Sequence, residues 1–272
     1  MMIGKLLGDG SITKQNGRRP RFQFTHVNTD IDWSRYCYDQ LSKTIPLNPP
    51  MFKKTIDPRL IKGYSLSYYV QSKTSNIICY LRKKWYVNRK KVIPFDLLKT
   101  YFNKQTLAWW YMDDGHLKIK DNIPQKIILS TESFTTEENK SLIHFLDQTY
   151  NLKFRLDKQN RIILYNQFQI KYFLYLVQPY LHPSMYRKII PYQNIIHALP
   201  ARRTTIYLPV SININSPTKD INTALQYLPI LLNTIKTGLL YDEFKEHLFD
   251  KIKTTQNSYQ IIINDTHLSN LQ

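Results

Sequence analysis

The sequence predicts an α+β fold in which one chain carries the same series of elements twice. The stretch "MIGKLLGDG" at residues 2–10 is echoed by "LAWWYMDDG" at residues 107–115, and each is an apolar run that ends in Asp-Gly. Two further echoes, "RKKVIP" and "YRKIIP", end at Pro94 and Pro191. Similar spacings between similar motifs indicate an internal repeat. We predict repeats over 1–100 and 101–195, followed by a C-terminal extension over 196–272.

The composition is that of a folded protein without a membrane span or a disulfide scaffold. Apolar residues make up 42% of the 272 residues, enough to form a core. No apolar run is long enough to cross a bilayer, and no secretory signal is present, so we expect a protein that is not secreted. The 7 glycines and the many Lys, Asn, Ile and Tyr residues suggest an AT-rich genome. We therefore expect an organelle (mitochondrion or chloroplast) or a bacterial cytoplasm.

The net charge of +18 is unevenly distributed along the chain. Residues 1–200 hold 31 Lys/Arg and 14 Asp/Glu, whereas residues 201–272 hold 7 and 6. A basic excess of this size on one part of a chain is typical of proteins that bind nucleic acid. A membrane surface would attract the same charge, but no basic amphipathic helix favours it.

The first repeat is predicted to begin with a short helix over 2–8. Gly4 and Gly8 share one face of this helix, which is reasonable if another backbone comes very close. Gly10 is predicted to end the helix in a left-handed conformation. The elements predicted after it are strands at 11–14 and 19–26, a helix at 30–43, strands at 51–57 and 64–73, and a helix at 75–87.

The second repeat follows the same order. Thr135 and Thr136 precede acidic residues, which is a strong signal for the start of a helix. The predicted elements are a helix at 107–114, strands at 116–120 and 125–134, a helix at 135–150, a hairpin at 153–166 and a helix at 167–181. The pattern is lost after Pro191, where 241–252 is a helix candidate.

The Asp-Gly endings carry the chemistry. A buried carboxylate at the negative end of a helix is unfavourable unless it is paired. Two such helices side by side become reasonable if divalent cations lie between them, because Mg²⁺ binds carboxylates and the carbonyls left free at helix ends. This arrangement suits metal-assisted phosphodiester hydrolysis. The alternative is that Asp9 and Asp114 are ordinary turn residues before glycine.

Together, the two stretches resemble the paired motifs of the LAGLIDADG homing endonucleases in their single-chain, two-motif form, over residues 1 to about 191. The resemblance implies two pseudo-symmetric αββαββα repeats, antiparallel saddle sheets that lie in the DNA major groove, and motif helices packed at the central interface. It also implies a monomeric, intron-encoded enzyme that uses Mg²⁺ or Mn²⁺ to make a staggered double-strand cut at a long DNA target. One departure is Trp109, which stands where the first motif has Gly4.

The resemblance also implies roles for particular residues at the motif ends. Asp9 and Asp114 correspond to the metal-binding acids, while Gly8 and Asp113 would lend backbone carbonyls. On this alignment the Asp113 side chain is not the essential carboxylate.

Two lysines correspond to the basic residues that the family places near each cleavage centre. Lys91 of "KKVIP" and Lys188 of "YRKIIP" match these positions, and could polarise the attacking water or stabilise developing charge. The alternative is that both contact phosphates from loops. Lys90 and Arg187 are the neighbours most easily confused with them.

The polar faces of the predicted strands supply candidates for reading base edges, because the major groove shows a distinct pattern for each base pair. In the first repeat these are Lys14, Arg19, Arg21, Gln23 and Thr25. In the second they are His116, Lys118, Lys120, Ser130, Arg155, Lys158 and Arg161.

Two other functions compete with DNA cleavage. An RNA-splicing maturase on the same fold would bind host intron RNA, and retained motif acids favour cleavage without excluding splicing. A non-catalytic DNA-binding regulator would need neither the acids nor the lysines.

Overall fold

The computed structural model describes residues 1–120 and 123–189. The predicted C-terminal extension and the helix candidate at 241–252 lie outside the described residues. In the described part, no helix is both long and apolar enough to span a membrane.

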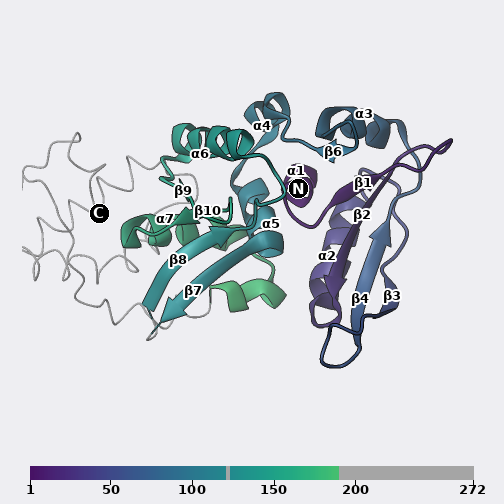
Figure 1. The fold of residues 1–272 in the computed structure, drawn as a ribbon, viewed down its shortest axis with the longest axis horizontal. Helices are drawn as coiled ribbons and strands as arrows, with labels where there is room; N and C mark the ends of the chain where they lie inside the picture. The colour runs from purple at the N-terminus through teal and green to yellow at the C-terminus, as the bar shows by residue number, and fades with distance from the viewer. Residues whose placement is uncertain (121–122, 190–272) are drawn as a thin grey trace, which may run out of the picture.

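The order αββαββα occurs twice, as the repeat predicted (Figure 1). The first copy is α1 (Met2–Leu7), β1 (Ser11–Thr13), β2 (Arg21–Val27), α2 (Ile31–Leu41), β3 (Met51–Ile56), β4 (Tyr64–Gln71) and α3 (Asn76–Trp85). The second is α5 (Lys104–Asp114), β7 (Gly115–Lys120), β8 (Ile123–Leu129), α6 (Thr136–Tyr150), β9 (Arg155–Leu156), β10 (Ile162–Leu164) and α7 (Gln167–Val177). Short 3-10 helices lie at Asn28–Asp30 (η1), Gln178–Tyr180 (η2) and Pro183–Lys188 (η3).

Each copy forms one antiparallel four-stranded sheet, in the orders β1-β2-β4-β3 and β7-β8-β10-β9. Strand β2 shows why a sheet forms here. Phe22, Phe24 and His26 are buried while the residues between them are more exposed, so one face joins the core and the other stays open. The α+β fold class and the two antiparallel sheets are thereby confirmed.

Helices α1 and α5 lie between the two sheets and pack directly on each other (Figure 1). A Cβ added to Gly4 would lie 2.5 Å from the carbonyl oxygen of Thr106 and 2.9 Å from the Cβ of Trp109. Gly4 therefore permits the close helix approach that the sequence predicted. The asymmetric pair of Gly4 and Trp109 is part of the same contact.

Three local expectations were wrong or incomplete. Gly10 does not take a positive φ, and its lack of a side chain instead permits contact with the backbone carbonyl of Lys5, which a Cβ would approach to 2.5 Å. Arg19 lies outside β2, which begins at Arg21. The sequence analysis also gave no element to the link between the repeats, which holds the hairpin β5 (Tyr86–Val87) and β6 (Lys90–Lys91) and the helix α4 (Phe95–Tyr101).

The two repeats share one hydrophobic core. Buried side chains from α1, β2 and α2 belong to the same cluster as those from α5, α6 and α7. Trp109 and Trp110 of α5 are fully buried at its centre. The helices that carry the Asp-Gly motifs are therefore fixed by packing from both halves.

We expect Gly4→Ala to lower the free energy of unfolding by about 1–3 kcal/mol, the usual cost of overpacking a well-packed contact. The reason is that the new methyl group would meet a backbone carbonyl and the base of a buried tryptophan. Urea denaturation measures the change. The matched control is Gly17→Asn, at an open turn glycine with φ +71, where Asn tolerates the backbone and no atom lies within 4 Å. Equal losses in both variants would contradict the close-contact explanation.

Candidate active site

The two motif acids lie at the ends of the two central helices. Asp114 is the last residue of α5, and Asp9 comes two residues after the end of α1. The side chain of Asp9 is 34% exposed, and Asp114 is half-buried. Both carboxylates are therefore accessible from solvent at one end of the helix pair.

The surroundings of these acids oppose their negative charge. Burial, followed by the charge of Asp113, raises the pKa of Asp9 to about 7. The same two causes raise the pKa of Asp114 to about 6. Carboxylates that are raised in this way gain from a bound cation, because the cation favours the charged form.

Lys91 is brought to this site by the β5–β6 hairpin. Asn88 and Arg89 take positive φ angles of 48° and 67° at its tip, which makes a tight turn. The ammonium of Lys91 donates to the carbonyl of Gly10 at 2.8 Å and to that of Gly8 at 3.5 Å. Burial lowers the pKa of Lys91 to about 8, although nearby carboxylates partly oppose the shift.

Lys188, in η3, occupies the corresponding place at the end of α5. Its ammonium donates to the carbonyls of Tyr111 (3.0 Å), Asp113 (3.1 Å) and Met112. Burial lowers its pKa to about 8 as well. Each lysine thus lies beside backbone carbonyls at or just after the end of one motif helix.

The two neighbouring basic residues are placed elsewhere. Lys90 is exposed, and Arg187 forms an ion pair with Asp30 at 2.9 Å. The structure therefore separates Lys91 and Lys188 from the residues with which they could be confused.

A buried polar network that was not predicted lies beside Asp9. Lys5 of α1 is fully buried, and its ammonium lies 2.7 Å from Oδ1 of Asp113 and 2.6 Å from Nε2 of His26. Trp33 donates to the same Oδ1 at 2.9 Å. The signal that could have revealed the network was a single lysine inside an otherwise apolar helix, since a buried charge requires a partner.

The charges in this network compensate each other. Burial opposes the charge of Lys5, but Asp113, Cys37 and Asp9 together outweigh it, and the pKa of Lys5 is raised. Burial likewise opposes the charge of Asp113, but Lys5 and His26 together lower the pKa of that carboxyl to about 2. Burial and the charge of Lys5 lower the pKa of His26. His26 is therefore neutral, accepts from Lys5 through Nε2 and donates through Nδ1 to Ser34 at 2.6 Å.

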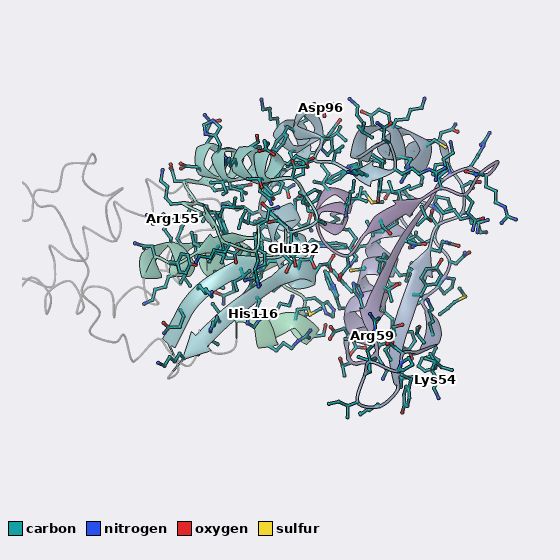
Figure 2. The ribbon with its side chains drawn as sticks, in the orientation of Figure 1. Lys54, Arg59, Asp96, His116, Glu132 and Arg155 are labelled. Carbon is teal, nitrogen blue, oxygen red and sulfur yellow. The ribbon has the colours of Figure 1, made fainter. Side chains whose placement is uncertain are left out.

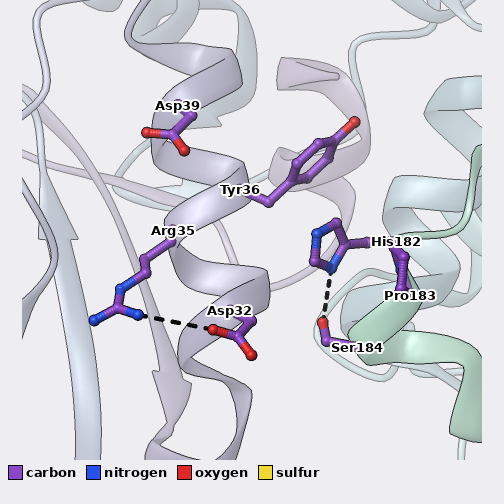
Figure 3. Close-up of a pocket in the computed structure, with 7 residues that line it drawn as sticks. All are labelled: Asp32, Arg35, Tyr36, Asp39, His182, Pro183 and Ser184. Carbon is purple, nitrogen blue, oxygen red and sulfur yellow. Dashed lines mark hydrogen bonds and ion pairs between the residues drawn. The ribbon is translucent and has the colours of Figure 1, made fainter.

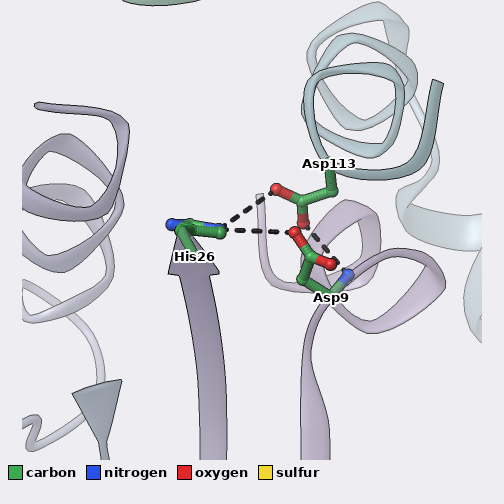
Figure 4. A group of neighbouring side chains, drawn as sticks. All are labelled: Asp9, His26 and Asp113. Carbon is green, nitrogen blue, oxygen red and sulfur yellow. Dashed lines mark hydrogen bonds and ion pairs between the residues drawn. The ribbon is translucent and has the colours of Figure 1, made fainter. Parts of the chain in front are cut away.

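Asp9, His26 and Asp113 could in principle hold a metal ion, because one ligand atom from each lies within 4.8 Å of the others (Figure 4). The ammonium of Lys5 already lies in contact with Asp113 and His26. We interpret this cluster as an ion pair with a neutral histidine rather than as a metal centre.

The end of the helix pair fits a divalent cation better. Asp9 and Asp114 offer carboxylate oxygens, and the carbonyls of Gly8 and Asp113 lie at the same helix ends. Hard cations such as Mg²⁺ prefer such oxygen ligands and add waters and phosphate oxygens. Each of these carbonyls also accepts from an ammonium, Gly8 from Lys91 at 3.5 Å and Asp113 from Lys188 at 3.1 Å. The ligand set stays a prediction.

Strand β2 places its predicted DNA-contacting residues on one face. Arg21, Gln23 and Thr25 lie opposite the buried Phe22 and Phe24. Lys14 follows β1, and Arg19 lies in the exposed turn between the strands.

Residues on β4 extend this face and were missed. The register pairs Gln23 with Gln71, Thr25 with Tyr69 and Val27 with Ser67, so the partners share the open face. Their signal was the alternation in "YSLSYYVQ", which the analysis used only to predict a strand.

The second sheet has a more apolar face than predicted. His116 and Lys118 alternate with the buried Leu117, as expected. However, the cross-strand neighbours of His116 on the same face are Ile128 and then Ile163, which are both buried. Only the next neighbour, Arg155, is polar. Figure 2 shows His116 and Arg155 in this half of the molecule.

The remaining predicted residues of the second sheet lie at its ends. Lys120 is exposed at the end of β7, and Lys158 is exposed in the β9–β10 turn. Ser130 is half-buried after β8, and its amide donates to the carbonyl of Asp114. Arg161 is bound to Asp157 within the same turn, which reduces its freedom to contact DNA.

A pocket of about 410 Å³ lies between α2 and the start of η3 (Figure 3). It contains none of the predicted site residues. Arg35 is paired with Asp32, and His182 bonds to Ser184 and packs on the ring of Tyr36. These side chains are bound to each other, so the pocket is not part of the candidate active site.

The chain is similar to a protein named as an intron-encoded endonuclease and to one named as an mRNA maturase. It is 34% identical to "Probable intron-encoded endonuclease 1" of Wickerhamomyces canadensis, over 70% of this chain and 82% of that protein. It is 28% identical to "Cytochrome b mRNA maturase bI2" of Debaryomyces hansenii, over 70% of this chain and 72% of that protein.

A solved structure supports the same relationship. The homing endonuclease I-WcaI, bound to its DNA recognition sequence, superposes with a TM-score of 0.59 at 26% identity, over 70% of this chain and 84% of that one. Residues 1–176 match the family described as "LAGLIDADG DNA endonuclease family". The chain belongs to the LAGLIDADG DNA endonuclease family.

Proposed function

We propose that this protein is a site-specific, metal-dependent homing endonuclease encoded by an intron, which acts as a monomer on a long double-stranded DNA target. The observation that carries the proposal is the meeting of both motif acids and both lysines at one end of the α1–α5 pair. The relative named as an intron-encoded endonuclease and the DNA-bound neighbour support it. The location in an organelle or a bacterial cytoplasm stays a prediction. The repeat boundaries at residues 100 and 195 stay predictions as well.

The residues suggest how the site works. Asp9, Asp114 and the carbonyls of Gly8 and Asp113 would hold Mg²⁺ or Mn²⁺. When bound, such an ion supplies charge stabilisation for phosphodiester hydrolysis. Lys91 and Lys188 lie within reach of the same helix ends, where an ammonium stabilises charge that develops on phosphate oxygens.

The open face of the first sheet is suited to base reading. Gln71 accepts from Arg21 at 3.2 Å and donates to Oε1 of Gln23 at 3.3 Å, and that oxygen also accepts from Thr13 at 3.4 Å. The side-chain oxygens of Gln23 and Gln71 are therefore already hydrogen-bonded within the sheet. The side-chain N–H groups of Arg21 and Gln23 remain available to donate to a base. A donor-rich edge complements guanine, whose N7 and O6 are both acceptors.

The second candidate function is RNA splicing, which the likeness to a cytochrome b mRNA maturase favours. Host intron RNA would then be the partner. Stimulation of intron splicing in vitro distinguishes this function from DNA cleavage.

We expect Asp114→Asn to reduce double-strand cleavage of the intron-less allele in Mg²⁺ by at least about 10³-fold, or roughly 4 kcal/mol of transition-state stabilisation. The amide cannot carry the negative charge that holds the cation. Binding to the same DNA in Ca²⁺ should be retained. The matched control is Asp32→Asn, an exposed acid on α2. Tight binding of a verified target by the wild type, without any cut, would contradict the endonuclease proposal and favour the maturase.

We also expect Asp114→Asn to raise the Tm of the metal-free protein at pH 8 by about 2–4 °C, which corresponds to roughly 1 kcal/mol in a chain of this size. The pKa of Asp114 is about 6 in the folded protein, above its ordinary value of 3.8. The folded state therefore binds more protons between these pH values, and stability is lost as the pH rises through 6. The higher Tm of Asp114→Asn should disappear near pH 4, where the Asp114 carboxyl of the folded wild type is protonated.

His26 has the opposite pH dependence, because its pKa is lowered and the folded state resists its protonation. His26 is present in both the wild type and Asp114→Asn. The difference in Tm between the two proteins therefore reports the effect of the Asp114 carboxylate alone. Mg²⁺ should raise the Tm of the wild type more than that of the variant. A variant that is less stable than the wild type at pH 8 would contradict the predicted repulsion.

We expect Gln23→Glu to change base preference at one position of the target from guanine towards cytosine, since a carboxylate accepts from the cytosine amino group. A wrong base at such a contact costs about 1–3 kcal/mol. Selection from a library of randomised targets measures the change. Gln148→Glu, an exposed position on α6, adds the same charge away from the sheet. A uniform loss of affinity in both variants, without altered preference, would indicate charge repulsion alone.

A further inference from the structure

The buried ion pair between Lys5 and Asp113 joins the two repeats, and the described residues contain no second copy of it. In the motif alignment, Asp113 corresponds to Gly8, and Lys5 corresponds to Trp110. Trp110 is fully buried, and its indole N–H has no hydrogen-bond partner among the described residues. The two halves of the site are therefore built differently around equivalent acids.

Both oxygens of the Asp113 carboxylate are occupied by groups from the first repeat. Oδ1 accepts from Lys5 at 2.7 Å and from Trp33 at 2.9 Å. Oδ2 accepts from the backbone N–H of Asp9 at 3.3 Å. A carboxylate from the second motif thus binds the backbone of the acid in the first motif.

Gly8 provides the space for this contact. A Cβ added to Gly8 would lie 2.6 Å from the Cβ of Asp113 and 2.8 Å from its Oδ2. The small residue of one motif and the acid at the equivalent place in the other are therefore complementary. The carboxylate could not approach the backbone of Asp9 in this way past a larger residue.

The two motif acids are held in different ways. Asp114 is the last residue of the eleven-residue helix α5, whereas α1 ends at Leu7 and Asp9 lies in the turn after it. The helix hydrogen bonds fix the backbone before Asp114. The amides on either side of Asp9 also donate to α1, Gly8 to the carbonyl of Gly4 at 3.0 Å and Gly10 to that of Lys5 at 2.6 Å. The amide of Asp9 itself donates across the helix pair to Asp113.

We infer that Asp113, with its charge balanced by Lys5, is a positioning residue for Asp9, so that the two halves of the site depend unequally on this pair. This inference rests on the proposed endonuclease function. It adds that the Asp113 side chain acts through the Gly8–Asp9 backbone, whereas its carbonyl belongs to the predicted ligand set.

The test uses the full-length protein with the paired substitution Lys5→Met and Asp113→Ala. Both charges are removed together, because removal of only one would leave the other buried without a partner. Methionine retains the length of the lysine side chain, and alanine retains the carbonyl of residue 113. The control is Leu142→Ala, which opens a cavity in the core at a fully buried position of α6.

Two quantities are measured. The first is hydrogen exchange of the Asp9 amide, by NMR without metal, which should become about tenfold faster relative to neighbouring amides in the paired variant. The second is the ratio of the cleavage rates of the two DNA strands in single-turnover reactions, which should change by about tenfold because small displacements at a reacting centre have large kinetic effects. In Leu142→Ala, a general loss of stability should leave both quantities at the wild-type values.

The outcomes are distinguishable. If the paired variant folds and either quantity is unchanged, the inference is overturned. If the paired variant does not fold, an unprotected Asp9 amide in the wild type overturns the inference, and a protected one that exchanges faster in Trp33→Phe supports it. If the wild type binds its target without cutting, the endonuclease proposal fails, and hydrogen exchange alone decides whether Asp113 positions Asp9.

Discussion

The close approach of α1 and α5 is the constraint on which the site depends. Gly4 allows the backbone of Thr106 to come near, and Gly8 admits the side chain of Asp113. The negative ends of two helices then meet, together with the acids that follow them. This concentration of negative charge explains why the ammonium of Lys5 is buried, and those of Lys91 and Lys188 are partly buried, around the helix ends despite the cost of desolvation.

Much of the fold could be predicted from the sequence because its signals are local. The capping box of Thr135 and Glu138 begins α6, and the alternation in β2 separates a buried face from an open one. The β5–β6 hairpin lacked such a signal. Its two-residue strands are too short to show a period, and Asn88 and Arg89 replace the glycine-containing pair that usually marks a tight turn. Gly10 was misread because a glycine required for close contact looks the same in sequence as one required for a left-handed turn.

The candidate site was predictable only in part for a related reason. The motif acids, Lys91 and Lys188 are visible in the sequence, and the structure places all four at the helix ends. The partner of Lys5 is 108 residues away, so no local pattern could identify it. The apolar row through Ile128 and Ile163 depends in the same way on strand register rather than on the pattern within one strand.

The unequal construction of the two halves suits a protein that holds both repeats in one chain. In a symmetric dimer, identical residues would occupy equivalent positions on the two motif helices. Two glycines at the place of Gly8 and Asp113 would provide no carboxylate to hold Asp9, and two aspartates would lack the space that the glycine provides. A tandem repeat removes this restriction, because each position can hold a different residue in each copy. The buried ion pair of Lys5 and Asp113 can then organise the contact between α1 and α5. The motif acids at the end of that contact, Asp9 and Asp114, are still both aspartates.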